Sequence, residues 1–322
     1  MKLREKIILT ILVIGMSVLV YSGLWSDTVY AGSKAGKPYI EVNVSKKTMT
    51  AGKSVTFKAK VYNSTSAVKW SVSDKNIAVV TQKGKLTAKR AGKVTVCAKA
   101  GNLTGKIAVT VKGKKLIAVD PGHQSKGDSR LEPSGPGSNT KKARVAGGTT
   151  GKYTKVPEYK LTLTIALKVK EELWNRGYEV VMTREKNDVN ISNKERAELA
   201  NASGADICIR LHADGAASSS ASGASALYPS AKNKYVSKLS KQSKALSGAV
   251  LDAYCRMTAA KNRGLSARDD LTGTNWSEIP VTVLEMGFMT NKQEDKKMQT
   301  SEYQDKMVQG ICDGIDSYYN NK

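Results

Sequence analysis

Two patterns of hydrophobic residues divide the chain. Between residues 37 and 112, apolar and polar residues alternate over short runs, and small turn residues separate the runs. Alternation with a period of two is typical of strands that bury one face, so this region is predicted to be an all-β sandwich. The predicted strands cover residues 40–44, 55–61, 68–72, 94–98 and 107–111.

From residue 116 onward, apolar runs alternate with segments of helical spacing. The runs are rich in Ile, Val and Leu, as strands buried on both faces of a parallel sheet are. Pro157 and Gly177 bracket the first helical segment, and Ser192 with Glu195 forms a capping box for the second. We therefore predict an α/β domain with a mostly parallel central sheet flanked by helices. The predicted strands are 116–119, a run ended by Asp-Pro-Gly, 178–184, 205–212 and 281–286, and the predicted helices are 157–176, 192–202, 234–258 and 302–319.

The N-terminus has the features of an export signal. It has a basic start, an apolar core from residue 7 to about residue 25, and a small-residue exit at Val29-Tyr30-Ala31. We predict a secretory signal peptide over residues 1–31, cleaved after Ala31. An uncleaved membrane anchor is the alternative, since the apolar run is nearly long enough to span a bilayer. In both cases the rest of the chain, with domains at 37–112 and 115–320, is predicted to act outside the cytoplasm.

The positive charge is concentrated in the β region. The chain has a formal net charge of +24, and residues 32–115 hold 19 Lys and Arg against Glu41 and Asp74, which is +17. So basic a domain suits a polyanion, and an exported protein meets anionic wall polymers before nucleic acid. The alternative is a solvated lysine-rich surface that only resists aggregation. The four cysteines are scattered within apolar segments and are predicted to be free thiols.

Four short motifs punctuate the β region. They are Gly52 before Val-Thr-Phe, Val68-Lys-Trp70-Ser, Gly84-Lys-Leu-Thr-Ala and Gly92-Lys-Val-Thr-Val. Together they resemble a bacterial immunoglobulin-like domain of the group 2 type, over essentially all of residues 37–112. The resemblance implies a surface spacer or an adhesive module without chemistry of its own. Trp70 is predicted to be the core tryptophan of the sandwich.

The only two histidines of the chain, His123 and His212, each come at the end of a predicted strand. Neighbouring parallel strands end at the same edge of a sheet, so the two imidazoles are expected side by side there. Glu158, in the first turn of a predicted helix, can add a carboxylate to that edge. Two histidines and one carboxylate leave one position of a tetrahedral zinc site open, which is the pattern of catalytic rather than structural zinc.

Glu285 is the most anomalous charge of the sequence, because it interrupts the apolar run 281–288. A carboxylate inside a buried strand costs several kcal/mol unless it has a partner or lies near a cation. A buried salt bridge to Arg184 or Arg210 is one explanation. The other is catalysis, because a zinc hydrolase needs a second, unligated glutamate as general base and as proton carrier to the leaving amine. The second explanation predicts amide hydrolysis.

A series of motifs, in order along residues 115–320, resembles the zinc-dependent N-acetylmuramoyl-L-alanine amidases of the amidase-3 family. The resemblance implies one zinc ion per catalytic domain, held by His123, Glu158 and His212, with Glu285 as the catalytic glutamate. It implies peptidoglycan as substrate, cut between the lactyl group of N-acetylmuramic acid and L-alanine, for remodelling or lysis of the wall. The motifs are Asp120-Pro-Gly-His123, Pro157-Glu158-Tyr-Lys-Leu, Gly177-Tyr-Glu-Val-Val-Met-Thr-Arg184, Arg196-Ala-Glu-Leu-Ala-Asn201, Arg210-Leu-His212-Ala, Asn262-Arg263-Gly264 and Val283-Leu-Glu285-Met-Gly-Phe-Met-Thr-Asn291.

The chain departs from the family pattern in places that spare the ligands. Gln124-Ser125 stands where the family often has Gly-Gly, Asp214 stands where it often has Asn, and the loop 124–156 is long and rich in glycine. These departures bear on the substrate groove rather than on activity. Arg184, Asn201 and Asn291 occupy family-motif positions, and we predict substrate contacts or support of the ligands for them, with a purely structural role as the alternative.

Two other functions fit the same residues. One is a non-catalytic wall-binding or adhesive protein with an amidase-like domain, and the intact Glu285 argues against it. The other is a zinc peptidase that cuts within the stem peptide, which analysis of the products separates from an amidase. Nothing in the sequence fixes the oligomeric state.

Overall fold

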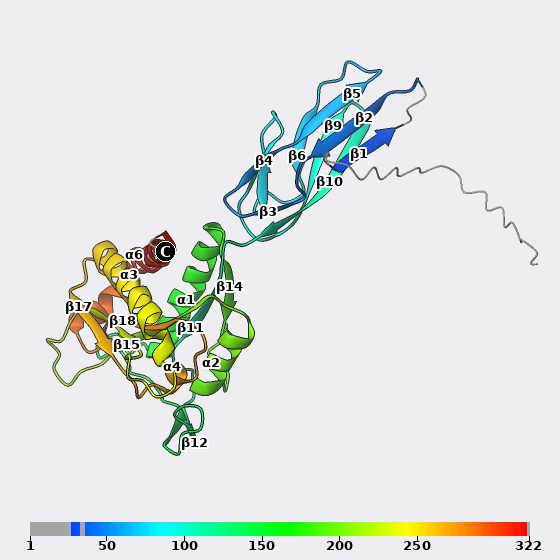
Figure 1. Ribbon diagram of the computed structural model, residues 1–322. Coiled ribbons are helices and arrows are strands. Elements are labelled where there is room, and N and C mark those ends of the chain that lie inside the picture. The colour runs from blue at the N-terminus through cyan, green and yellow to red at the C-terminus, as the bar shows by residue number, and fades with distance from the viewer. Residues whose placement is uncertain (1–26, 33–35, 321–322) are drawn as a thin grey trace, which may run out of the picture.

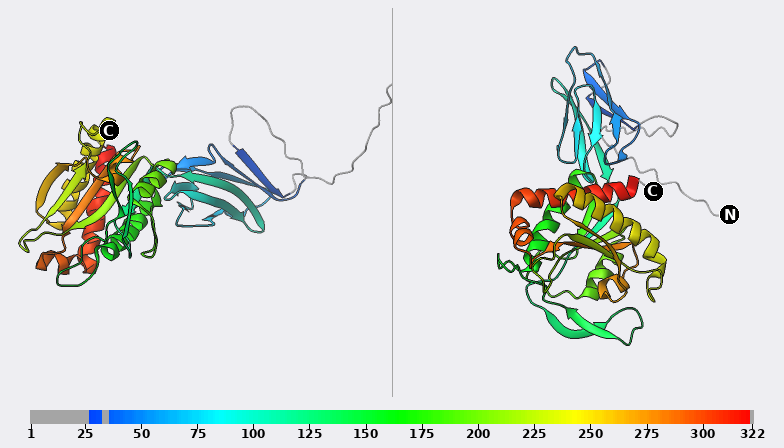
Figure 2. Two further views of the ribbon diagram at one scale, coloured as in Figure 1. Left: turned by 90° about the horizontal axis from the view of Figure 1, so that it is seen from below. Right: turned by 90° about the vertical axis from the view of Figure 1, so that its left-hand side faces the viewer.

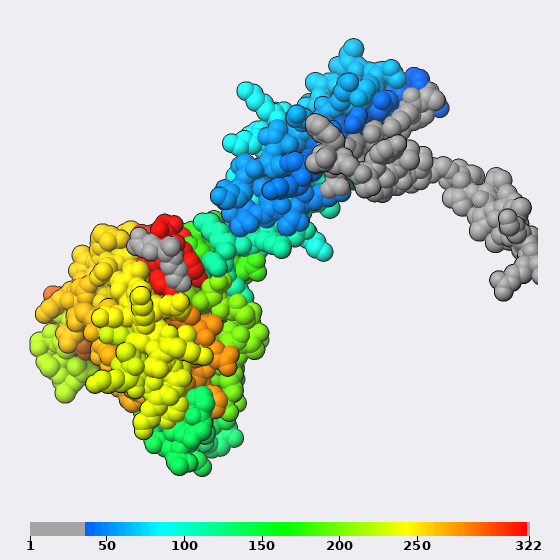
Figure 3. Space-filling view, in the orientation of Figure 1, coloured from blue at the N-terminus to red at the C-terminus, as the bar shows by residue number. Residues whose placement is uncertain are grey.

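The computed structural model describes residues 27–32 and 36–320, which form a β-sandwich and an α/β domain placed end to end (Figures 1 and 3). Both predicted fold classes are confirmed. Most of the predicted signal peptide, with its apolar core, lies outside the described residues. Its last residues belong to β1 (Asp27–Gly32), which pairs antiparallel with β2 (Tyr39–Val44) and spans the predicted cleavage point. No helix in the described part of the chain is long and apolar enough to cross a bilayer.

The sandwich encloses a core to which every sheet contributes, and Trp70 belongs to it, with 8% of its surface exposed and its ring edge-on to Phe57. The predicted strand 55–61 is interrupted at Phe57, whose N–H donates to the carbonyl of Gly84. Gly84 has φ +78, and a Cβ there would lie 2.4 Å from the Phe57 carbonyl oxygen, so glycine is required. The sheets are β1-β2-β5 (Lys58–Tyr62), β3 (Thr48–Thr50)-β10 (Leu103–Lys112)-β9 (Gly92–Ala100)-β6 (Lys69–Val72), and β4 (Ser54–Thr56)-β8 (Lys85–Ala88)-β7 (Ala78–Val80).

A six-stranded sheet forms the middle layer of the α/β domain. Its neighbours pair in parallel except β16 and β18, which run antiparallel. The four apolar runs that were predicted to be strands form the first four strands of this sheet, and its last two strands, β16 and β17, were not predicted. In order across the sheet the strands are β14 (Glu179–Met182), β11 (Leu116–Pro121), β15 (Ile207–Asp214), β18 (Val281–Phe288), β16 (Ala224–Tyr228) and β17 (Asn262–Ala267).

Helices cover both faces of this sheet. The large core joins the sheet to α1, α3 and α6, and a smaller cluster around Ala200 and Cys208 joins the other face to α2. The capping box predicted at Ser192 and Glu195 is present at the start of α2. The helices are α1 (Glu158–Asn175), α2 (Asn193–Ala202), α3 (Ser240–Thr258), preceded by the short 3-10 turn η1 (Ser237–Leu239), α4 (Thr272–Asn275), α5 (Lys292–Lys297) and α6 (Ser301–Asn320).

The loop 124–156 is partly ordered into a hairpin of β12 (Asp128–Pro133) and β13 (Lys141–Val145). It projects from the end of the α/β domain that lies farthest from the sandwich (Figures 1 and 2). Arg144 ties it to Glu195 of α2, and the Trp276 Nε1–H donates to the Pro133 carbonyl. All four cysteines are free, as predicted.

The sandwich is joined to the α/β domain at the edge of the sheet where the parallel strands begin. Backbone bonds link Lys114 to Gly177 and Glu179 to Lys115. Arg90 of the sandwich forms an ion pair of 2.6 Å with Glu171 of α1. The opposite edge of the sheet, where the strands end, is therefore left open for a functional site.

Candidate active site

The structure brings His123, Glu158 and His212 together at the carboxyl edge of the sheet. His123 follows β11, His212 lies near the end of β15, and Glu158 is the first residue of α1. The His212 Nδ1 is 3.1 Å from both the His123 Nε2 and the Glu158 Oε1, and the last two atoms are 3.2 Å apart. These three residues are the only group of possible metal ligands found among the described residues.

Hydrogen bonds from the backbone fix the orientation of these groups. The His123 Nδ1 lies 2.9 Å from the carbonyl of Ala146. Because a carbonyl only accepts, Nδ1 carries the proton, and Nε2 is left with a lone pair that can bind a metal. The Glu158 oxygens accept from the N–H groups of Ala213 and Thr149. Burial alone would raise the pKa of Glu158, but hydrogen bonds to both histidines outweigh it, so this pKa lies below its usual range.

The donor set fits a zinc ion. Tetrahedral zinc with bonds of about 2.0–2.1 Å holds its ligand atoms about 3.3 Å apart, and the three atoms here form a triangle of nearly that size. Two imidazole nitrogens and one carboxylate oxygen are also the ligand types that zinc prefers. The exposed fractions of the histidine side chains are 15% and 17%, so the centre is open on one side.

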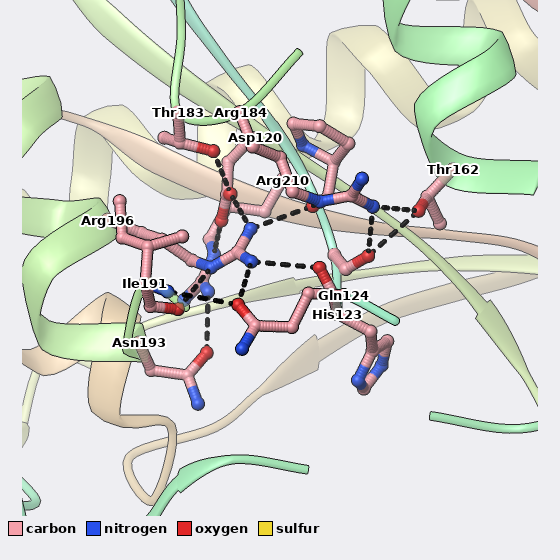
Figure 4. A network of polar contacts seen from close by, with 12 residues as sticks. Asp120, His123, Gln124, Thr162, Thr183, Arg184, Ile191, Asn193, Arg196 and Arg210 are labelled. Carbon is pink, nitrogen blue, oxygen red and sulfur yellow. Dashed lines mark hydrogen bonds and ion pairs between the residues drawn. The ribbon is translucent and has the colours of Figure 1, made fainter. Parts of the chain in front are cut away.

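The backbone that carries His123 is held in an unusual conformation by two buried arginines (Figure 4). His123 has φ +60, a left-handed conformation that few non-glycine residues adopt. Arg184 donates to the carbonyls of Pro121 and Gly122, and Arg196 donates to those of Pro121 and His123. Arg184 also donates to the carbonyl of Tyr159, so it ties the first turn of α1, and with it Glu158, to the same turn.

A buried carboxylate holds this arginine network in place. Asp120 is 1% exposed and accepts from Arg196 at 2.8 Å, from Arg210 at 2.7 Å and from the Thr183 hydroxyl. Figure 4 shows Asp120 with its partners to one side of His123. Burial would raise the pKa of Asp120, but the charges of Arg210 and Arg196 outweigh it and hold this pKa below its usual range.

Two glycines allow the loops to pack against the ligands. A Cβ at Gly122 would lie 2.3 Å from the His212 ring, and a Cβ at Gly148 would lie 2.8 Å from the His123 ring. At Gly148 the φ of +76 further disfavours a side chain. The ring positions therefore depend on the absence of side chains at both places.

Glu285 lies beside the cluster without belonging to it. It is the register partner of His212 across the β15–β18 pair. Burial raises the pKa of Glu285 well above its usual range, and the carboxylates of Glu158 and Asp214 add to the rise. None of the ion pairs between described residues includes Glu285. The two arginines considered as its partners are bonded elsewhere, Arg210 to Asp120 and Arg184 to backbone carbonyls. The salt-bridge explanation of this residue thus has no support from either arginine.

Two cavities of about 500 and 580 Å³ meet at the cluster. His123, His212 and Glu285 line both of them. The first extends between the hairpin and α4 and includes Lys142 and Asp270, which are joined by an ion pair. The second runs along small residues such as Gly147 and Gly215. An extended substrate can therefore pass over the cluster with a part on each side.

The three remaining predicted site residues have structural contacts. Arg184 is 3% exposed, which leaves it no surface for a substrate. Asn201 ties α2 to the backbone at Trp276 and Glu278, and Asn291 caps α5 and donates to the carbonyl of Ser219. Sequence reasoning gave no role to Asp120 and Arg196, although both stood in the quoted motifs. A charged residue inside an apolar strand, at Asp120, was the available signal.

The fold and the site define an α/β enzyme whose candidate metal centre lies at the carboxyl edge of its sheet, carried next to a β-sandwich. The N-acetylmuramoyl-L-alanine amidase family matches residues 117–317, and the chain belongs to this family. The bacterial immunoglobulin-like domain of group 2 matches residues 38–111. The chain is thus an N-acetylmuramoyl-L-alanine amidase, which hydrolyses the amide between N-acetylmuramic acid and L-alanine of peptidoglycan. The amidase activity predicted from the sequence is thereby confirmed.

Relatives that match mainly the α/β domain carry the same description. An N-acetylmuramoyl-L-alanine amidase of Mycobacterium tuberculosis is 27% identical over 212 residues, which are 62% of this chain and 84% of the relative. The germination-specific amidase of Bacillus subtilis is 27% identical over 224 residues, 65% of this chain and 81% of the relative. The crystal structure of the amidase from Clostridium difficile 630 matches with a TM-score of 0.54 at 27% identity and covers 66% of this chain and all of that one.

Proposed function

We propose that this chain is an exported, zinc-dependent amidase in which His123, Glu158 and His212 hold one zinc ion and Glu285 is the catalytic glutamate. The observation that carries the proposal is the triangle of three donor atoms with an unpaired carboxylate beside it. When bound there, zinc would supply a Lewis acid that polarises the substrate carbonyl.

Glu285 is proposed to transfer the protons that hydrolysis requires. Glu285 is placed to accept a proton from the attacking water and to give a proton to the amide nitrogen that leaves, so that water is added across the C–N bond. The products are a lactyl carboxylate and a free amino terminus on L-alanine. A carboxyl with a raised pKa, as burial gives Glu285, is suited to carry a proton between these two atoms.

The residues behind the centre position it. Arg184 and Arg196 hold the turn that carries His123, and Asp120 neutralises the second of them. Arg184 is therefore proposed as a positioning residue that connects His123 with Glu158. For Asn201 and Asn291 we propose support of the loops that line the groove, through α2 and α5.

We further propose that residues 1–31 direct export, that residues 37–112 and 115–320 are the two domains of the exported protein, and that it acts in the cell wall. The basic composition of the sandwich supports a second contact with the wall, through anionic polymers. A spacer that binds the wall would keep the catalytic domain near its substrate.

Glu285→Gln separates catalysis from metal binding. The variant is expected to keep one zinc per chain, because Glu285 lies outside the ligand triangle, and to lose at least about 100-fold in kcat, as expected when a general acid-base group is removed. The measurements are metal content and the release of L-alanine amino termini from peptidoglycan. His212→Ala is the matched variant, expected to lose zinc and activity together.

Two outcomes would contradict this assignment. Loss of zinc in Glu285→Gln would make Glu285 a ligand and would require a different role for Glu158. Products in which the lactyl group remains amidated would show cleavage within the stem peptide instead.

A further inference from the structure

One face of the sandwich carries five exposed lysines and no acidic residue. In the sheet β3-β10-β9-β6, buried and exposed residues alternate, so every second side chain points away from the core. Neither an aspartate nor a glutamate occurs in any of the four strands. We call this surface the lysine face, and it is formed by Lys69, Lys93, Lys99, Lys106 and Lys112.

The register of the strands brings these lysines together in two groups. Lys69 lies directly opposite Lys99, and Lys106, opposite Cys97, is a diagonal neighbour of Lys99. At the other end of the sheet, Lys93 lies opposite Thr110 and is thus diagonal to Lys112. Like charges placed directly opposite each other in a sheet are destabilising. Repulsion between these lysines therefore destabilises the sheet, and an anion bound between them would relieve this repulsion.

Nothing in the described part of the protein neutralises this face. None of the five lysines takes part in an ion pair between described residues, and the ion pair of Arg90 reaches Glu171 of the other domain. In the α/β domain, by contrast, Lys115, Lys168 and Lys170 each pair with a carboxylate. The outer surface of the opposite sheet also differs, because Glu41 lies there, directly opposite Lys60.

The separation of the two groups indicates an extended ligand. Lys93 and Lys99 are six residues apart on β9, which corresponds to about 20 Å along a strand. A single small anion cannot contact both groups. The row runs along β9 and β10 toward the linker that joins the catalytic domain, because Lys112 is the last residue of β10.

The side chains between the lysines narrow the class of ligand. They are small or hydroxylic, such as Thr95, Ala108 and Thr110, and the four strands place no large apolar side chain on this face that could insert into a lipid surface. No arginine is present either, so the face lacks the planar group that binds carboxylates and phosphates in a bidentate way and sets a fixed geometry. Lysines act as point charges that tolerate a flexible chain of phosphates.

We propose that the lysine face binds a linear phosphate polymer of the cell envelope, laid along β9 and β10. This inference rests on the proposed extracytoplasmic location and deepens the proposed contact with the wall, because it assigns the contact to one sheet face and to phosphate chemistry. The polymer bridges the two lysine groups and leads toward the catalytic domain.

The test compares two triple variants of the purified full chain that have the same net charge. One is Lys69→Gln/Lys99→Gln/Lys106→Gln on the lysine face, and the control is Lys58→Gln/Lys60→Gln/Lys85→Gln on the opposite surface of the sandwich. The probe is long-chain linear polyphosphate, with pyrophosphate as the small-anion arm and vesicles of anionic phospholipid as the membrane arm.

At about 0.1 M salt the first variant is expected to bind polyphosphate roughly tenfold more weakly and with a shallower salt dependence, while the control stays within about twofold of the unmodified chain. Equal losses in both variants would show diffuse attraction by net charge and overturn the proposal. So would pyrophosphate binding as tight as that of the polymer, or tighter binding to the vesicles.

Hydrolysis of soluble muropeptides serves as an independent readout. Both variants are expected to keep it, because all six lysines lie in the other domain. If the unmodified chain failed to hydrolyse muropeptides, the proposed active site would be wrong, while the binding result would stand on its own.

Discussion

Asp120 supports the turn that carries His123 from behind, although it touches none of the three proposed ligands and lines neither cavity. Its carboxylate lies between two arginines, and one of these, Arg196, holds the carbonyl of His123. Breaking a buried ion pair strongly destabilises a protein, because the remaining charge stays buried without a partner.

Asp120→Asn keeps the shape of the side chain and removes its charge. We expect a loss of about 3–5 kcal/mol in the free energy of unfolding of the α/β domain at neutral pH, measured by denaturant titration. Asp305→Asn, which breaks the exposed pair with Lys168, is the control and is expected to cost no more than about 1 kcal/mol. Equal effects of the two substitutions would mean that the buried network contributes little.

The same carboxylate predicts how stability depends on pH. Because the folded protein holds the pKa of Asp120 below its usual range, this group stabilises the fold above the pKa of the unfolded chain, about 3.9, and the contribution is lost as the pH falls below that value. Asp120→Asn is therefore expected to show a smaller loss of stability between about pH 5 and pH 2 than the unmodified chain. An unchanged slope would exclude Asp120 as a source of acid sensitivity.

At the scale of single residues, the sequence allowed prediction of the groups that are chemically unusual. Two histidines at strand ends and a glutamate within an apolar strand stand out locally, and the strand topology places them at one edge. The partners of Asp120 could not be predicted in this way, because Arg196 and Arg210 lie 76 and 90 residues further along the chain. No local pattern shows which of many charged residues will meet inside a fold.

At the scale of elements, the predictions held where hydrophobic periodicity is strong. The helix α1 and the strand β18 lie close to their predicted bounds. The strand β17 was missed because most of its residues are exposed, so that it has no apolar pattern to detect. The hairpin β12–β13 was missed for a related reason, since contacts with α2 and with Trp276 hold its polar strands in place.

The start of α2 links an element to the site, because the helix carries Arg196 in its first turns. Ser192→Ala removes the side chain that accepts from the Glu195 N–H, and we expect a loss of about 1 kcal/mol and a decrease of about 2–4 °C in the Tm of this domain. Glu198→Ala, which breaks an exposed pair with Lys194 on the same helix, should cost about half as much or less. A larger effect of the control in calorimetry would contradict a role for the cap.

At the scale of the molecule, two separate hydrophobic cores share no residue, and they are connected through a linker, backbone bonds and the ion pair of Arg90. Such a molecule is expected to unfold in two steps. Only one of the two domains contains the proposed metal centre, so a ligand that binds there stabilises one step alone, by about 2.7 kcal/mol when its free concentration is 100 times its Kd.

Calorimetry with and without a chelator tests this division. The chelator is expected to lower the transition of the α/β domain and to leave that of the sandwich in place, and Val96→Ala, a substitution in the sandwich core, identifies the second transition by shifting it alone. His123→Ala should make the protein insensitive to the chelator.

If the chelator shifted both transitions, the domains would be coupled more tightly than their junction implies, and the sandwich would take part in holding the catalytic domain rather than serve as an independent anchor. If it shifted neither in the unmodified chain, the triangle of His123, Glu158 and His212 would not be a stabilising metal site.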